Sequence, residues 1–331
     1  MKRVDSWSLR EVVREHRLAP VRQRQCGRGR YKTEVTLETN GQGAWWGGVI
    51  QCRARMCPVC FIARRFRLAR EIQHTVYERE QDTKQPSWLL TFTIRHRQGH
   101  PVEITREVRR CWRALLQTRA FRNWSHDNQI EWIAAEEVTR GENGWHPHIH
   151  SLILPRADLD WDDGAWFASA WLGAMWARIV ERRMGREHVP IAPYACDLTP
   201  CDAAEYLAKI GLELADPAMV KGRSPIGMLA DGAKGDSEAL DRYMELQRAR
   251  ARARDVTFSK GLTTIRESAP PAPMTAELAT VRGSQWTQLL HQGWRVPLDI
   301  TTAAKCPESA ALTLAGLLYD YDPVANGCQT C

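Results

Sequence analysis

The stretch "QIEWIAAEEVTRGENGWHPHIHSLIL", residues 129–154, decides how the centre of this chain folds. Two apolar-rich segments flank the short polar sequence "RGENG", which is typical of a tight turn between antiparallel strands. A turn centred between Glu142 and Asn143 places Glu137 opposite His148. A register shifted by one residue would use Glu136 instead, because side chains alternate between the faces of a strand. The sequence therefore predicts a β-hairpin that brings a carboxylate opposite a histidine.

Three histidines, His146, His148 and His150, occupy alternate positions of the second segment. Side chains two residues apart lie on the same face of a strand, so the three imidazoles share a face. A lone buried histidine usually hydrogen-bonds within the core, whereas three at this spacing favour metal binding by at least two. Two imidazoles with Glu137 leave positions open for phosphate oxygens and water, and suit Mg²⁺ or Mn²⁺ better than a closed zinc site. Because strands accept proline at ends and edges, Pro147 places His146 at the strand entrance, without an assigned role.

The segment "TPCDAAEYLAKI", residues 199–210, predicts a helix with Thr199 as its N-cap. Three polar side chains share one face of this helix: Asp202, Tyr206 and Lys209. A tyrosine at the rim of the core is the ordinary interpretation, but a nearby metal site makes Tyr206 a candidate nucleophile. A cation and an ammonium group help a phenol, with a pKa of about 10, to attack a phosphodiester. Asp202 or Glu205 could take the proton or activate water at a later step.

A cysteine cluster precedes the hairpin, and its members are Cys26, Cys52, Cys57 and Cys60. Four thiolates make a closed tetrahedral site for structural zinc, and the Cys57–Cys60 knuckle is its most specific part. Cys26 is the least certain ligand, with His16 as its replacement. Buried free thiols are the alternative interpretation. Three further cysteines near the end of the chain favour incidental thiols over a second zinc site: Cys306, Cys328 and Cys331.

The chain is basic, with 46 Lys and Arg against 39 Asp and Glu and a net charge of +7. A basic balance suits a nucleic-acid partner, because released counterions drive binding to phosphates. Residues 61–80 predict a helix with a cluster of arginines, which we expect to face DNA: Arg64, Arg65, Arg67 and Arg70. A solvated charged helix face is the alternative interpretation of the same cluster.

The 331 residues are 44% hydrophobic and 26% charged, which is ordinary for a globular protein. No membrane span is expected, and the N-terminus lacks the apolar core of a signal peptide, so a cytoplasmic location is expected. Strands are predicted at 87–94 and 194–198, helices at 101–119, 163–184 and 237–253, and a loop at 211–236. Together with the hairpin, these elements predict an α+β fold with an antiparallel sheet.

Three segments follow from this pattern along the chain. Residues 1–80 form a zinc-binding segment and basic helix, and residues 81–266 carry the hairpin and the Tyr206 helix. Residues 267–331 begin with the proline-rich sequence "ESAPPAPM" and make a linker and small appendage.

The order of these motifs resembles that of the rolling-circle replication initiators of small bacterial plasmids, in the HUH endonuclease superfamily. The matching stretches are "CRARMCPVC", "LLTFTI", "EEVTRGENGWHPHIHSLIL", "DAAEYLAKI" and "TFSKGL", so the resemblance covers about residues 20–265. It implies an antiparallel sheet of about five strands with flanking helices, which makes residues 81–266 an HUH endonuclease domain.

The resemblance also implies a function and a set of site residues. His148 and His150 would be the histidine pair that binds Mg²⁺ or Mn²⁺, with Glu137 as the acidic third ligand. Tyr206 would nick one strand of the plasmid origin, in single-stranded or supercoiled duplex form, leaving a 5′-phosphotyrosine and a free 3′-OH primer. Lys209 would support the phosphate. Asp202 stands where some members have a glutamate as general base, which leaves that role open between Asp202 and Glu205. A host helicase is a further candidate partner.

Three other functions fit parts of the sequence. A transposase or a mobilisation relaxase of the same superfamily would use the same nicking chemistry. A histidine-triad nucleotide hydrolase would use the middle histidine as nucleophile without a metal, but Pro147 and Ser151 depart from its apolar pattern. A zinc DNA-binding protein without enzymatic activity would leave Tyr206 unexplained.

Overall fold

The structure is a computed structural model, and it describes residues 6–39, 44–95, 100–156, 161–202, 206, 225–251, 253–254, 256–262, 276–292, 314 and 318. The chain divides into two compact units, each built from two separate stretches. Residues 1–12 and 61–270 form the first, which we call the sheet unit. Residues 13–60 and 271–331 form the second, which we call the cysteine unit. The segments expected from the sequence follow chain order and do not coincide with these units.

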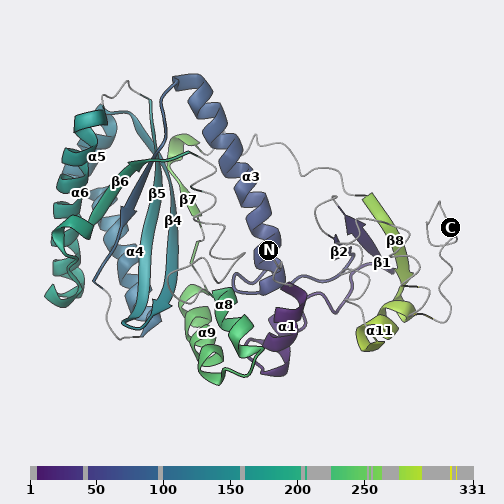
Figure 1. The fold of residues 1–331 in the computed structure, drawn as a ribbon. Helices are drawn as coiled ribbons and strands as arrows, with labels where there is room; N and C mark the ends of the chain where they lie inside the picture. The colour runs from purple at the N-terminus through teal and green to yellow at the C-terminus, as the bar shows by residue number, and fades with distance from the viewer. Residues whose placement is uncertain are drawn as a thin grey trace. The chain divides into compact units, whose positions relative to one another are not determined.

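The sheet unit contains both helices and strands (Figure 1). Its strands are β3 (Trp88–Phe92), β4 (Ile130–Gly141), β5 (Gly144–Pro155), β6 (Cys196–Pro200) and β7 (Val256–Phe258). Its helices include most of α3 (Pro58–Thr83), α4 (Pro101–Gln117), α5 (Arg119–Asp127), α6 (Trp161–Met184), α8 (Pro225–Gly232) and α9 (Ser237–Arg250). Short 3-10 turns are η1 (Arg186–His188), η2 (Ala192–Tyr194) and η4 (Lys260–Leu262). Within the described ranges, no helix combines the length and apolarity needed to cross a membrane.

A five-stranded antiparallel sheet of order β6-β3-β5-β4-β7 forms the centre of this unit. The expected α+β architecture with an antiparallel sheet is therefore confirmed. The β4–β5 hairpin turns at Glu142–Asn143, and Gly144 tolerates the positive φ of 107° that the turn requires. Glu137 pairs with His148, which is the register that the turn position predicts and excludes the one-residue shift.

The two faces of this sheet are covered by different helices. On one face Phe92 packs against Trp112 of α4 and Trp176 of α6, with ring centroids 5.9 and 4.9 Å apart. On the other face Leu152 belongs to a buried cluster that includes Ile72 of α3. Because side chains alternate along β5, His148 and His150 share the face of Leu152. The histidines therefore lie on the same sheet face that packs against α3, the helix shown beside the sheet in Figure 1.

The cysteine unit contains a second sheet that the sequence reasoning did not anticipate. Its three strands, in the order β2-β1-β8, are β2 (Ala44–Gly47), β1 (Glu34–Thr39) and β8 (Ala276–Arg282). Among its described residues, the helices include α2 (Val21–Arg24), α11 (Gly283–Gln292), the last turn of α1 (Ser6–Glu15) and the first residues of α3. Trp46 packs edge-on against Trp286 at 5.2 Å, and both indoles are buried. The residues after the proline-rich stretch thus complete a sheet that begins before residue 40.

Two of the predictions for residues 199–236 were wrong. Thr199 is not a helix N-cap, because it pairs with Leu89 as part of β6. Tyr206 is itself helical, and its N–H donates to the carbonyl of Asp202 at 3.0 Å. Within the segment predicted as a loop at 211–236, residues 225–232 form α8, whereas 211–224 lie outside the described residues.

Pro147 lies inside β5 rather than before it, and His146 pairs with Thr139 of β4. The proline is compatible with this position because β3 pairs with β5 at Ile149–Ile153, beyond Pro147. The missing N–H therefore costs no ladder hydrogen bond to β3. His146 is thus a strand residue on the same face as the other two histidines.

Candidate functional site

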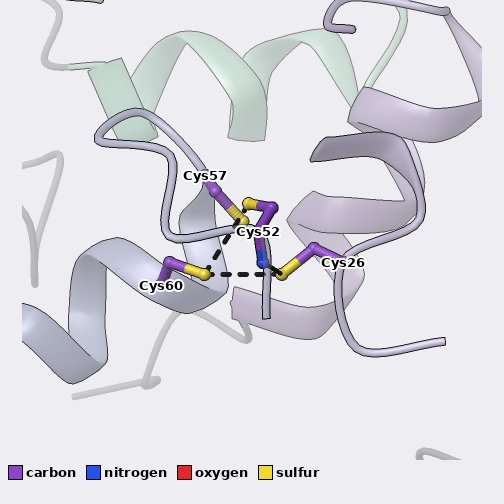
Figure 2. A group of neighbouring side chains, drawn as sticks. All are labelled: Cys26, Cys52, Cys57 and Cys60. Carbon is purple, nitrogen blue, oxygen red and sulfur yellow. Dashed lines mark hydrogen bonds between the residues drawn. The ribbon is translucent and has the colours of Figure 1, made fainter. Parts of the chain in front are cut away.

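The four cysteines expected to bind zinc lie together in the cysteine unit. Their sulfur atoms all lie within 4.8 Å of one another, and all four side chains are buried. Figure 2 shows the sulfurs pointing at a common centre, with Cys26 Sγ 3.4 Å and Cys52 Sγ 3.7 Å from Cys60 Sγ. A tetrahedral zinc with bonds of about 2.3 Å holds its sulfurs about 3.8 Å apart. The cluster therefore has the size of a four-thiolate metal site.

Backbone N–H groups donate to these sulfurs and would stabilise negative charge on them. The amide of Cys52 donates to Cys26 Sγ at 3.3 Å, and the amide of Arg53 donates to Cys60 Sγ at 3.3 Å. The amide of Ala54 donates to Cys52 Sγ at 3.4 Å. Hydrogen bonds from Cys26, then Cys52 and Cys57, lower the pKa of the Cys60 thiol below its usual range. The pKa of the Cys57 thiol is raised, chiefly by its hydrogen bond with Cys26. The hydrogen bond with Cys26 also lowers the pKa of the Cys52 thiol. A bound cation would favour the thiolate form of all four cysteines.

A second group of candidate ligands lies on the histidine face of the sheet unit. His150 is buried, and its Nε2 lies 2.5 Å from Oε2 of Glu137, which comes from the neighbouring strand. The His148 ring is stacked on that of His150, with centroids 6.0 Å apart, and the His146 ring lies 6.5 Å from that of His148. The hairpin register therefore brings three imidazoles and one carboxylate onto one patch of the sheet.

Thr91 is a member of this site that sequence reasoning missed. Its hydroxyl lies 3.1 Å from Nδ1 of His150, because Thr91 of β3 pairs with His150 of β5. When Nδ1 donates to the hydroxyl, the lone pair of Nε2 is free for a cation. No sequence signal identified Thr91, since the β3–β5 register joins strands 59 residues apart.

The side chain of Glu136, the adjacent carboxylate, lies on the opposite face of the sheet. It is buried, and its Oε2 accepts from Arg109 Nε at 2.6 Å and from Arg250 Nη1 at 3.2 Å. These contacts join β4 to α4 and α9 and use the carboxylate for packing. Glu137, rather than Glu136, is thus available on the histidine face.

The two candidate metal sites differ in how complete they are. Over the ranges that the structure describes, the cysteines are the group whose ligand atoms all approach within 4.8 Å; the histidine pair with Glu137 is not so closely assembled. Two imidazole nitrogens and one carboxylate oxygen are nevertheless atoms that can bind a divalent cation. An incomplete set is what a site needs if substrate oxygens are to complete it.

Tyr206 lies under α3, next to the backbone of the histidine strand. Its side chain is fully buried, and its hydroxyl donates to the carbonyls of Ile133 at 3.1 Å and His150 at 3.4 Å. Burial raises the pKa of the phenol above its usual range. The Tyr206 ring therefore packs in the buried core on the same sheet face as the imidazoles, with its hydroxyl at the His150 backbone.

The remaining predicted residues are less fully placed. Asp202 is exposed one residue after Cys201, whereas Glu205 and Lys209 lie outside the described residues. Of the arginines on α3, Arg67 is 68% exposed and lies 3.5 Å from Glu71, and Arg64 lies over the Phe61 ring at 5.8 Å. Arg70 is half-buried, and the Arg65 side chain is outside the described set. A DNA contact by this helix stays a prediction.

These sites define an α+β protein that joins a four-cysteine centre to an antiparallel hairpin with a histidine face. Residues 47–180 match the family described as Replication protein. The match includes three of the four cysteines and the whole hairpin, and it ends before Tyr206. No solved structure matches the chain significantly.

One curated relative is a protein named "Neomycin resistance protein" from Streptomyces cyanogenus. It is 31% identical over 137 residues, which cover 32% of this chain and 31% of the relative. The chain therefore spans about a third of the length of that protein.

Proposed function

We propose that the protein is a plasmid replication initiator that nicks one DNA strand at the origin. The observation that carries this proposal is the contact between Glu137 and His150, beside His148, on a hairpin within the stretch that matches the replication family. In this reading the sheet unit is an HUH endonuclease domain, and His148, His150 and Glu137 hold Mg²⁺ or Mn²⁺. The bound cation would polarise the scissile phosphate.

Tyr206 is the proposed nucleophile. Its phenol oxygen attacks the phosphorus, the bond to the 3′ oxygen breaks, and the strand ends as a 5′-phosphotyrosine and a free 3′-OH. Asp202 or Glu205 takes the phenol proton or activates water in a later step, and Lys209 supports the phosphate. Because the hydroxyl is held by Ile133 and His150 carbonyls, attack requires the phenol to leave these two hydrogen bonds.

The four cysteines are assigned to structural zinc. Their buried, closed arrangement leaves no position for substrate, which favours a structural over a catalytic metal. Zinc would hold the start of α3 against the preceding loop, since Cys57 and Cys60 flank the first residues of that helix. Plasmid origin DNA is the proposed partner.

The test is covalent capture of DNA. The full chain is incubated with Mn²⁺ and a library of labelled single-stranded oligonucleotides, and any DNA-linked peptide is mapped by mass spectrometry. We expect the adduct on Tyr206, with loss of the adduct in Tyr206→Phe and on chelation of Mn²⁺. Tyr243→Phe is the matched control, because Tyr243 is also fully buried in the sheet unit. An adduct that persists in Tyr206→Phe would contradict the proposed nucleophile, and cleavage without any metal would favour a histidine-triad hydrolase.

A further inference from the structure

The cysteine unit has a strongly basic first half. Residues 13–60 contain nine Arg and Lys against three Asp and Glu. The side chains of Arg17, Arg22, Arg30, Lys32 and Arg53 are exposed. This concentration of positive charge lies outside the proposed nicking site, and neither that site nor the α3 arginines account for it.

Exposed apolar side chains lie among these charges. Tyr31 is 68% exposed, Val21 62% and Ile50 48%. An exposed aromatic ring among arginines offers a stacking surface next to positive charge. Five exposed residues of this segment make up what we call the Tyr31 surface: Arg22, Tyr31, Lys32, Ile50 and Arg53. The Arg30 guanidinium instead donates to the carbonyls of Lys32 and Thr33.

The backbone holds the two halves of the Tyr31 surface together. Arg30 and Val49 form an antiparallel bridge, and Tyr31 N donates to Gly48 O at 3.0 Å while Ile50 N donates to Gly29 O at 2.7 Å. The Ile50 side chain lies over Gly29, where an added Cβ would be 3.3 Å from it. Tyr31 and Ile50 thus lie on either side of one short bridge.

The cysteine centre fixes the ends of both paired segments. Cys26 precedes the segment of Tyr31, and Cys52 follows the segment of Ile50, with Cys52 N donating to Cys26 Sγ at 3.3 Å. Arg53 is held in place by its amide, which donates to Cys60 Sγ. The metal site therefore organises the surface that carries the exposed tyrosine.

We infer that the Tyr31 surface binds single-stranded DNA, separately from the histidine face. Arginine and lysine side chains would contact phosphates, while Tyr31 would stack on an unpaired base with Ile50 beside it. Single-stranded DNA is favoured over duplex because a duplex hides the base faces on which an exposed tyrosine stacks. This binding does not depend on nicking, so it is measured without Mg²⁺ or Mn²⁺.

The first test is fluorescence anisotropy with the zinc-loaded full chain and a labelled single strand of about 16 nucleotides. We expect Tyr31→Ala to weaken binding about tenfold and Tyr31→Phe to retain it, because the ring makes the stack. Tyr77→Ala and Tyr194→Ala are matched controls, with exposures of 60% and 71% in the sheet unit. Zinc content and circular dichroism of each variant establish that the unit is folded. Unchanged affinity in Tyr31→Ala, or equal affinity for the matching duplex, overturns the inference.

The second test measures the salt dependence of the same binding. The Arg22→Gln, Arg53→Gln double variant should lower the slope of log affinity against log salt by about 1.4, or about 0.7 for each lost phosphate contact. The control pair is Arg119→Gln with Arg122→Gln, two exposed arginines of α5. A slope that falls equally in both double variants, or in neither, shows that DNA is not held by the Tyr31 surface.

Discussion

The cysteine centre and the histidine face have similar numbers of candidate ligands, but the first set is closed and the second is open. In the cysteine centre four sulfurs lie within 4.8 Å of one another, and backbone amides donate to three of them. On the histidine face Glu137 contacts His150, and His148 stacks behind it. A closed set satisfies a metal by itself, whereas an open set leaves positions for a phosphate and water. The comparison separates the proposed structural zinc from the proposed catalytic cation.

The largest expected effect follows from breaking the closed set. Cys57→Ser should abolish zinc binding and unfold the cysteine unit, because structural zinc contributes about 10–16 kcal/mol to such folds. Metal content by mass spectrometry and thermal denaturation followed by circular dichroism measure the two effects. Cys201→Ser is the control, since Cys201 is a buried thiol that donates to the Asp202 carbonyl in the sheet unit. One zinc per chain and an unchanged melting curve in Cys57→Ser would contradict the assignment of Cys57 as a zinc ligand.

A smaller effect distinguishes two adjacent carboxylates of β4. Glu137→Gln should lower Mn²⁺ affinity and nicking by at least about 100-fold with little change in stability, because a ligand is lost. Glu136→Gln should instead cost about 3 kcal/mol of stability, since Arg109 and Arg250 lose their shared buried carboxylate. Calorimetric titration with Mn²⁺ and urea unfolding measure the two quantities. If Glu136→Gln is the variant that loses Mn²⁺, the assignment of the two faces is wrong.

The sequence predicted the histidine face better than its surroundings. The hairpin register followed from local features, namely the two-residue turn and the alternation of side chains, and these were enough to place Glu137 opposite His148. Thr91 could not be placed in the same way, because its contact with His150 depends on how β3 pairs with β5. Local periodicity specifies which face a residue occupies but not which distant strand lies beside it.

The cysteine unit illustrates the same limit. The knuckle spacing predicted a four-cysteine set correctly, since ligand spacing is a local signal. Val35 and Leu37 alternate as buried residues of β1, yet their partner strand β8 follows more than 230 residues later in the chain. The prediction of a separate terminal appendage missed this pairing. The prediction that Thr199 caps a helix was wrong for a related reason. Pairing of Thr199 with Leu89 outweighed its local preference for the N-cap position.

The smallest expected effect concerns the orientation of a single ligand on the open site. Thr91→Val removes the hydroxyl beside Nδ1 of His150 and keeps the β-branched shape, so the strand should stay intact. Loss of such an outer contact weakens metal binding by about tenfold, because the imidazole is no longer held in the tautomer that presents Nε2. Titration of Mn²⁺ into the full chain measures the change, and Thr91→Ser should restore affinity. Thr93→Val is the control, since the Thr93 hydroxyl donates to the Ile94 carbonyl instead. Equal Mn²⁺ affinity in Thr91→Val and the parent would mean that the open site, unlike the closed one, does not depend on hydrogen bonds to orient its ligands.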